Sequence, residues 1–108
     1  MNGHHNFRKA YVMEPSHDFS ALSSHCEEIV FLTTGYERDF PATCRAIREG
    51  LQNFQPEQDV LIPTGRVAAV LFAGYVLGRL QRMIQVGLYA NKIYTFEWMN
   101  LIPDNGGK

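Results

Sequence analysis

The hydrophobic positions of this chain fall into short apolar runs separated by turns and one long apolar segment. Residues 60–63 are a short apolar run, Thr64 and Gly65 interrupt it, and residues 67–78 are almost wholly apolar or small. A further apolar run follows at 85–89. A strand, a turn, a buried helix and another strand are the sequence pattern of a βαβ crossover. The pattern therefore predicts an α/β fold built around this stretch.

Strand patterns recur along the chain. Residues 28–33 contain four consecutive apolar side chains, which predicts a strand buried on both faces at the centre of a parallel sheet. Residues 93–100 alternate between apolar and polar, and a tight turn at Asn91 and Lys92 joins them to the run at 85–89. This arrangement predicts an antiparallel hairpin at one edge of the sheet. The other predicted strands are 9–14 and 60–63.

Two of the predicted helices precede the long apolar segment. In 40–54 the apolar side chains recur at steps of four and three and form one core-facing stripe, with Asp39 as the N-cap. The members of this stripe are Phe40, Cys44, Ile47, Leu51 and Phe54. A short helix is predicted at 17–26, with Ser16 as its N-cap.

The third predicted helix, 66–82, is apolar most of the way round, so we expect it to be covered on two sides. Gly74 and Gly78 would let one face lie close to the sheet. The opposite face consists of Ala69, Phe72, Ala73 and Val76. That face would need a second cover, either another helix or another subunit. We expect a homo-oligomer that forms through helix 66–82.

The elements follow the order β, short α, β, α, β, α, β, β. They predict one α/β domain with a small, mostly parallel sheet of three to four strands, βαβ units and a C-terminal antiparallel hairpin. A chain of 108 residues suits a single domain. We expect flexible ends at 1–8 and 103–108.

The charge balance and the apolar segments narrow the range of partners. The chain carries ten Lys and Arg against eleven Asp and Glu, a net charge of −1, which disfavours a general nucleic-acid or membrane-surface binder. Specific RNA or DNA binding by a local basic patch remains an alternative. This patch would consist of Arg45, Arg48, Arg79, Arg82 and Lys92. The longest apolar run is too short to cross a bilayer, and residues 1–12 lack the apolar core of a secretion signal. We therefore expect a cytoplasmic protein that makes no membrane contact.

The cysteines and histidines do not predict a metal site or a thiol enzyme. Cys26 and Cys44 lack zinc-ligand spacing, and Cys44 lies on the apolar stripe of a helix, so both are expected to be reduced and inert. His17 and His25 have no recognised ligand spacing with Cys26 either. We therefore expect no metal, no cofactor and no catalytic residue.

Candidate ligand-binding residues come from three turns that follow predicted parallel strands. Because the carboxyl ends of parallel strands open to one edge of a sheet, these turns should gather on one rim. Helix N-termini and glycine at that rim favour an anion, and Arg66 would clamp it. The sequence therefore predicts a small anionic or nucleotide-like ligand, although the standard nucleotide-binding motifs are absent. The candidate residues are His17, Asp18, Thr34, Gly35, Thr64, Gly65 and Arg66.

A purely structural interpretation of the same residues stays open. In that interpretation Asp18 caps the short helix and His17 packs locally. Thr64 then caps the long helix, Gly65 only makes a turn, and Arg66 is solvated.

Several motifs stand in a fixed order along the chain. They are His17-Asp18-Phe19-Ser20, Val30-Phe31-Leu32-Thr33 with Gly35, Pro56-Glu57 with Asp59, Thr64-Gly65, Val86-Gly87-Leu88-Tyr89 and Lys92-Ile93-Tyr94. In that order they resemble a family of small proteins encoded by tailed bacteriophages and found widely in aquatic viral sequences, whose pattern reads roughly HDYS, VFLTEG, PEDY, TG, GRLNLLLY and a GRY-type hairpin. Ser16 stands where glycine is common, and 95–97 stand where a Glu-Arg pair is expected. The resemblance spans 16–96 and implies a viral protein of the host-cell cytoplasm with an α/β fold, without implying an activity.

These observations favour a viral accessory protein that self-associates, binds an unknown host or viral partner and catalyses no reaction. The alternative is a small-molecule or nucleotide-binding domain, or a reduced hydrolase or transferase, with its site at the carboxyl ends of the parallel strands. A third interpretation is RNA or DNA binding through the local arginine patch.

Overall fold

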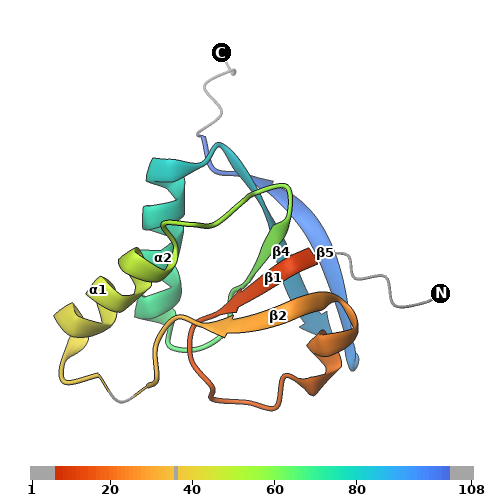
Figure 1. The fold of residues 1–108 in the computed structure, drawn as a ribbon, viewed down its shortest axis with the longest axis horizontal. Coiled ribbons are helices and arrows are strands. Elements are labelled where there is room, and N and C mark those ends of the chain that lie inside the picture. Colours follow the sequence, from red (N-terminus) through yellow and green to blue (C-terminus); the bar gives the residue numbers. More distant parts are fainter. Residues whose placement is uncertain (1–6, 36, 103–108) are drawn as a thin grey trace.

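The computed structural model describes residues 7–35 and 37–102, which form a five-stranded sheet with two α-helices on one face (Figure 1). The strands are β1 (Phe7–Val12), β2 (Cys26–Phe31), β3 (Asp59–Ile62), β4 (Met83–Ala90) and β5 (Ile93–Asn100). The helices are α1 (Phe40–Gly50), α2 (Val67–Leu80) and a short 3-10 helix, η1 (Ser20–Ser24). Of the ends predicted to be flexible, Phe7 and Arg8 belong to β1, while 1–6 and 103–108 lie outside the described residues.

The order of the strands in the sheet is β2-β1-β3-β4-β5. β1 pairs in parallel with both β2 and β3, β3 pairs in parallel with β4, and β5 runs antiparallel to β4. The prediction of a mostly parallel sheet with a C-terminal antiparallel hairpin is confirmed. Asn91 and Lys92 form the hairpin turn, and their positive φ angles, 54° and 69°, are those of a two-residue hairpin loop.

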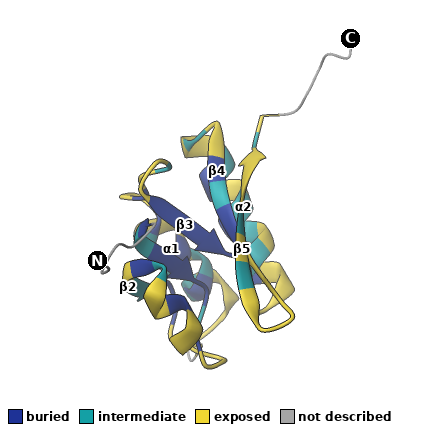
Figure 2. Ribbon diagram, turned by 90° about the vertical axis from the view of Figure 1, so that its right-hand side faces the viewer, coloured by how far each residue is buried: buried dark blue, intermediate teal, exposed yellow. Residues whose placement is uncertain are grey.

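β2 lies at an edge of the sheet, so the prediction of a central strand at 28–33 is wrong. Glu27 and Glu28 are exposed, and Phe31 keeps 43% of its surface accessible. The strands paired on both sides are β1, β3 and β4, and β3, in the middle of the sheet, is buried along its whole length (Figure 2). The cause is topological: the connection through α1 carries the chain from β2 past β1 to β3, which leaves the outer edge of β2 unpaired.

Hydrophobic residues form a separate cluster on each face of the sheet. One cluster joins α1 and α2 to the sheet and includes the fully buried Ile47 and Leu77. The other joins the η1 segment to the opposite face and includes Leu22 and Ile62. The chain moves in opposite directions along the sheet when it goes from β1 to β2 and from β2 to β3. Right-handed connections therefore place η1 and α1 on opposite faces.

Local signals fix the start of α1 better than its end. The Asp39 carboxylate accepts a hydrogen bond at 2.8 Å from the backbone N–H three residues later, so the predicted N-cap is confirmed. The helix ends at Gly50 rather than at 54, and Leu51 and Phe54 enter the core from the turn that follows. Phe40, the first member of the predicted stripe and the first residue of the helix, is 42% exposed, so the start of the stripe does not reach the core.

α2 rests on the sheet through a face rich in small residues. The buried residues of this face are Ala69, Ala73, Val76 and Leu77. The buried face, which packs against α1 and the sheet, thus contains alanines rather than the glycines, so the prediction that the glycine face lies on the sheet is wrong. Gly74 and Gly78 lie on the open side, where an added Cβ would meet nothing within 4 Å. In the described part of the chain, no helix has the length and apolar character needed to cross a membrane.

A buried carboxylate ties β3 to β1 and to the turn that follows α1. Asp59 is fully buried, and its two oxygens accept hydrogen bonds from Arg8 Nε at 3.1 Å and from Arg8 Nη2 at 2.8 Å. The backbone N–H of Gln55 also donates to this carboxylate, at 2.7 Å. A buried carboxylate is destabilising unless it is paired, so these contacts fix the amino end of the β1–β3 pair.

Replacing Asp59 with asparagine should lower the free energy of unfolding by about 1 to 3 kcal/mol, because one buried carboxylate oxygen becomes an NH2 group that faces the N–H donors of Arg8 and Gln55. Chemical denaturation followed by circular dichroism measures the change. Glu57→Gln, an exposed acidic residue in the preceding turn, is the matched control and should shift stability by less than about 0.5 kcal/mol. Equal stability of Asp59→Asn and the parent protein would contradict the anchoring role.

Candidate functional site

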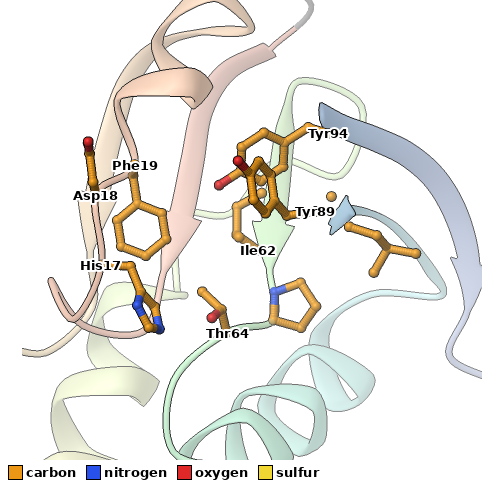
Figure 3. Close-up of a pocket in the computed structure, with 10 residues that line it drawn as sticks. His17, Asp18, Phe19, Ile62, Thr64, Tyr89 and Tyr94 are labelled. Carbon is orange, nitrogen blue, oxygen red and sulfur yellow. The ribbon is translucent and has the colours of Figure 1, made fainter. Parts of the chain in front are cut away.

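A pocket of about 490 Å³ opens at the carboxyl ends of β1, β3 and β4 (Figure 3). It lies beside the switch point of the sheet, where the connection that leaves β1 and the connection that leaves β3 run to opposite faces. Its volume falls in the range of ligand pockets, about 300 to 1,000 Å³. The lining residues are His17, Asp18 and Phe19 after β1, Ile62, Pro63 and Thr64 at the end of β3, Gly87, Leu88 and Tyr89 of β4, and Tyr94 of β5.

Aromatic side chains form two walls of the pocket. Tyr89 and Tyr94 are a cross-strand pair with ring centroids 4.8 Å apart. Their hydroxyl groups point into the pocket, toward the segment that carries Phe19 (Figure 3). Burial raises the pKa of Tyr94, and neighbouring Tyr89 and Asp18 raise it further. The Tyr94 hydroxyl therefore stays protonated at neutral pH and can donate a hydrogen bond.

Two of the polar side chains in the lining face the lower part of the pocket. The exposed His17 imidazole packs edge-on against Phe19, with ring centroids 6.1 Å apart. Figure 3 shows His17 and Thr64 on the same side of the cavity, below Ile62. An imidazole and a hydroxyl can each donate or accept a hydrogen bond, so this end of the pocket can orient a polar group on a ligand.

The Asp18 carboxylate bonds to the backbone of its own segment rather than facing the interior of the pocket. Its carboxylate accepts a hydrogen bond at 2.9 Å from the N–H of Ser20, the first residue of η1, and this bond lowers the pKa of Asp18. The carboxylate points away from the centre of the cavity (Figure 3). The short helix predicted at 17–26 is reduced to the single turn of η1, and Asp18 rather than Ser16 makes the side-chain hydrogen bond at its start.

Thr34 and Gly35 do not line the pocket. The Glu37 carboxylate accepts hydrogen bonds from the N–H groups of Thr34 and Gly35, at 2.8 and 3.2 Å, and from the Thr34 hydroxyl at 3.2 Å. These bonds, with the Thr34 N–H first, lower the pKa of Glu37. The backbone donors that the sequence suggested for an external anion are therefore occupied by a carboxylate of the same loop.

Gly65 and Arg66 also lie outside the pocket lining. Arg66 Nη2 lies 3.1 Å from the Glu14 carboxylate. The positive charge that was predicted to bind an anion is therefore paired with a carboxylate of the same chain. Gly65 has φ 123°, and an added Cβ would stand 3.1 Å from Met13, so both its conformation and its surroundings favour glycine. The predicted rim thus divides in two: His17, Asp18 and Thr64 line the pocket, whereas the other four residues form a polar cluster beside Glu14.

Sequence reasoning missed the far wall of the pocket, which comes from β4 and β5. Gly87 is the signal that could have indicated it, because glycine inside a strand often marks a close approach of other groups. An added Cβ at Gly87 would lie 2.6 Å from Ile62 and 2.9 Å from the Phe96 ring. Glycine at this position therefore allows the hairpin to close over the end of β3.

Within the described residues, no group of three His, Cys, Asp or Glu side chains could hold a metal ion. Cys26 is buried, its thiol contacts the Leu22 carbonyl oxygen at 3.5 Å, and burial raises the pKa of Cys26. A thiol in this environment is protonated and a poor nucleophile at neutral pH. The pocket lining contains aromatic rings and groups that can form hydrogen bonds, which are features of ligand-binding sites.

Searches of family models, of curated proteins and of solved structures find no match to this chain. The resemblance to small bacteriophage proteins therefore stays a prediction. What the pocket binds must be argued from its own residues.

Proposed function

We propose that this protein binds a small, neutral aromatic molecule in the pocket at the carboxyl ends of β1, β3 and β4. The observation that carries the proposal is a cavity of about 490 Å³ at the switch point of the sheet, with Phe19 on one side and the Tyr89–Tyr94 pair on the other. Apolar and aromatic walls with a few polar groups are the usual composition of small-molecule sites.

The lining chemistry suits a flat ring that carries a hydrogen-bonding edge. Aromatic walls favour stacked or edge-on contact with a ring, and such pairs add about 0.5 to 1.5 kcal/mol beyond the burial of area. The protonated Tyr94 hydroxyl can donate to an acceptor on the ligand, and His17 and Thr64 can pair with a polar substituent. Phenols, indoles and nucleobases share these features.

Charge favours a neutral ligand over the anionic one that the sequence predicts. Arg66 is already paired with Glu14, and Glu37 occupies the N–H groups of Thr34 and Gly35. Asp18 adds a negative charge at the edge of the pocket, since its pKa is lowered. A phosphate entering the pocket would therefore meet no arginine or lysine among the lining residues, and the charge of Asp18 at the edge would repel it.

The same contacts favour binding over catalysis. Asp18 is committed to the Ser20 N–H, so it is not placed to orient His17 as a base. We therefore place the enzymatic alternatives, a reduced hydrolase or transferase, behind simple ligand binding.

Replacing Tyr89 with alanine should weaken the binding of phenol, indole or adenine by about three- to tenfold, because it removes one stacking wall. Affinity is measured by titrating the labelled protein and following backbone amide shifts in NMR spectra. Phe40→Ala is the matched control, since Phe40 is a comparably exposed aromatic residue outside the pocket. If none of these probes perturbs 17–19, 62–64 or 87–89, the proposal is wrong.

We propose self-association through α2 as a second candidate function, in keeping with a viral accessory role in the host-cell cytoplasm. The observation that favours it is the outward face of α2, where Val67, Leu71 and Tyr75 are 74%, 70% and 57% exposed. Gly74 and Gly78 lie on the open side of the same helix and would let a second helix approach closely. This is not the face that the sequence suggested for the contact, because that face packs against α1 and the sheet, and the other helix is one of the two covers that the sequence allowed.

Replacing Leu71 with glutamate should convert an oligomer to a monomer, because a contact centred on α2 would then bury an unpaired charge. Sedimentation equilibrium over a range of protein concentrations measures the change. Ala21→Glu, at an exposed position of η1, is the control and should leave the oligomer intact. A parent protein that stays monomeric at millimolar concentration would contradict this candidate.

A further inference from the structure

We propose that the groove between α1 and α2 is a second binding site, for a carboxylate or phosphate group carried on an apolar stem. The groove encloses about 240 Å³ and belongs to the helix-covered face of the sheet, whereas the aromatic pocket lies toward η1 and the hairpin. Its lining residues are Arg48, Gln52, Tyr75, Val76, Arg79 and Leu80. This site goes beyond the proposed aromatic pocket and shares no residue with it.

Both arginines of the groove lie over aromatic rings. The Arg48 guanidinium carbon lies 5.3 Å from the centroid of the Phe72 ring. The Arg79 guanidinium carbon lies 6.0 Å from the Tyr75 ring, and its Nη1 donates a hydrogen bond to the Tyr75 hydroxyl at 3.4 Å. Side chains that are already oriented lose less conformational freedom when a ligand binds. The groove therefore presents two guanidinium groups that neighbouring rings help to orient.

Neither arginine has an acidic partner in the part of the chain that the structure describes. The ion pairs there join Arg8 to Asp59 and Arg66 to Glu14, and no carboxylate lies within 4.0 Å of Arg48 or Arg79. α2 itself, VAAVLFAGYVLGRL, contains no acidic residue. In a protein of net charge −1, this groove is a local region of positive charge. Guanidinium groups match carboxylate and phosphate oxygens with paired hydrogen bonds.

The apolar part of the lining indicates what carries the anion. Val76 is buried, and Leu80 and Tyr75 are exposed at 44% and 57%, so the stem of the ligand would meet apolar surface beside the two arginines. A volume of about 240 Å³ is below the usual range for a whole small-molecule site, about 300 to 1,000 Å³. It suits a single functional group with its stem, such as an aryl phosphate or an acidic side chain of another protein.

Nucleic acid fits this groove less well. Of the five basic residues in the predicted patch, only Arg48 and Arg79 line the groove. Lys92 lies in the β4–β5 turn, next to the strands that border the aromatic pocket. Backbone binding to a duplex or a single strand needs a longer basic track than two arginines.

The test uses phenyl phosphate and benzoate as probes, with benzyl alcohol as the neutral match, and follows the side-chain Nε–H signals of the arginines by NMR. We expect saturable shifts of the Arg48 and Arg79 signals with both anions and none with the alcohol. R48Q and R79Q should each weaken binding by about tenfold, and R79K should recover part of the loss. R45Q, in α1 but outside the groove lining, should bind as the parent does.

Failure here is distinguishable from failure of the aromatic pocket, because the two sites report through different signals. Shifts at 87–89 with unchanged Arg48 and Arg79 signals would overturn the groove and leave the pocket intact. Equal weakening in R45Q would also overturn the groove, since it would show binding to surface charge in general. A short peptide with glutamate beside leucine separates the sources: tighter binding of the peptide than of phenyl phosphate assigns the anion to a partner protein, and the reverse assigns it to a small molecule.

Discussion

The parallel pairing of β1 with β3 determines where the pocket of this protein opens. At the amino end of the pair, Asp59 is buried and accepts hydrogen bonds from Arg8 and from the Gln55 N–H. At the carboxyl end, the chain leaves β1 toward one face of the sheet and leaves β3 toward the other, which opens a crevice between them. The ion pair and the crevice are thus the two ends of a single structural element.

The hairpin turns this crevice into a pocket. Because Gly87 has no side chain, the Phe96 ring and Ile62 can approach the backbone of β4 closely. Phe96 also packs against Phe7 of β1, with ring centroids 4.9 Å apart, so the hairpin curves over the face of the sheet that η1 covers. This curvature brings the Tyr89–Tyr94 pair opposite Phe19.

Local features of the fold could be predicted from the sequence because local residues determine them. Asp39 caps α1, Asn91 and Lys92 turn the hairpin, and the apolar run of β3 is buried. Features that depend on distant neighbours could not be predicted in the same way. Four consecutive apolar residues indicate a buried strand, yet β2 is an edge strand because the next connection passes back over β1. The faces of α2 were predicted in reverse because its apolar residues surround it almost evenly.

The residues of the candidate site could also be predicted only in part. Parallel strands predict a shared rim, and His17, Asp18 and Thr64 do lie together at one pocket. The sequence could not show that Glu37 would occupy the N–H groups of its own loop, or that Glu14 would pair with Arg66, 52 positions away. These two carboxylates occupy the groups that the sequence suggested for an anion.

The central claim is that the crevice between β1 and β3 is the ligand site, and the most direct test is to locate a bound aromatic probe. Intermolecular nuclear Overhauser effects between indole and the labelled protein give this location. We expect contacts from the indole ring protons to Phe19, Tyr89 and Tyr94. Contacts confined to the α1–α2 groove or to the polar cluster beside Glu14, with none to these three rings, would contradict the claim.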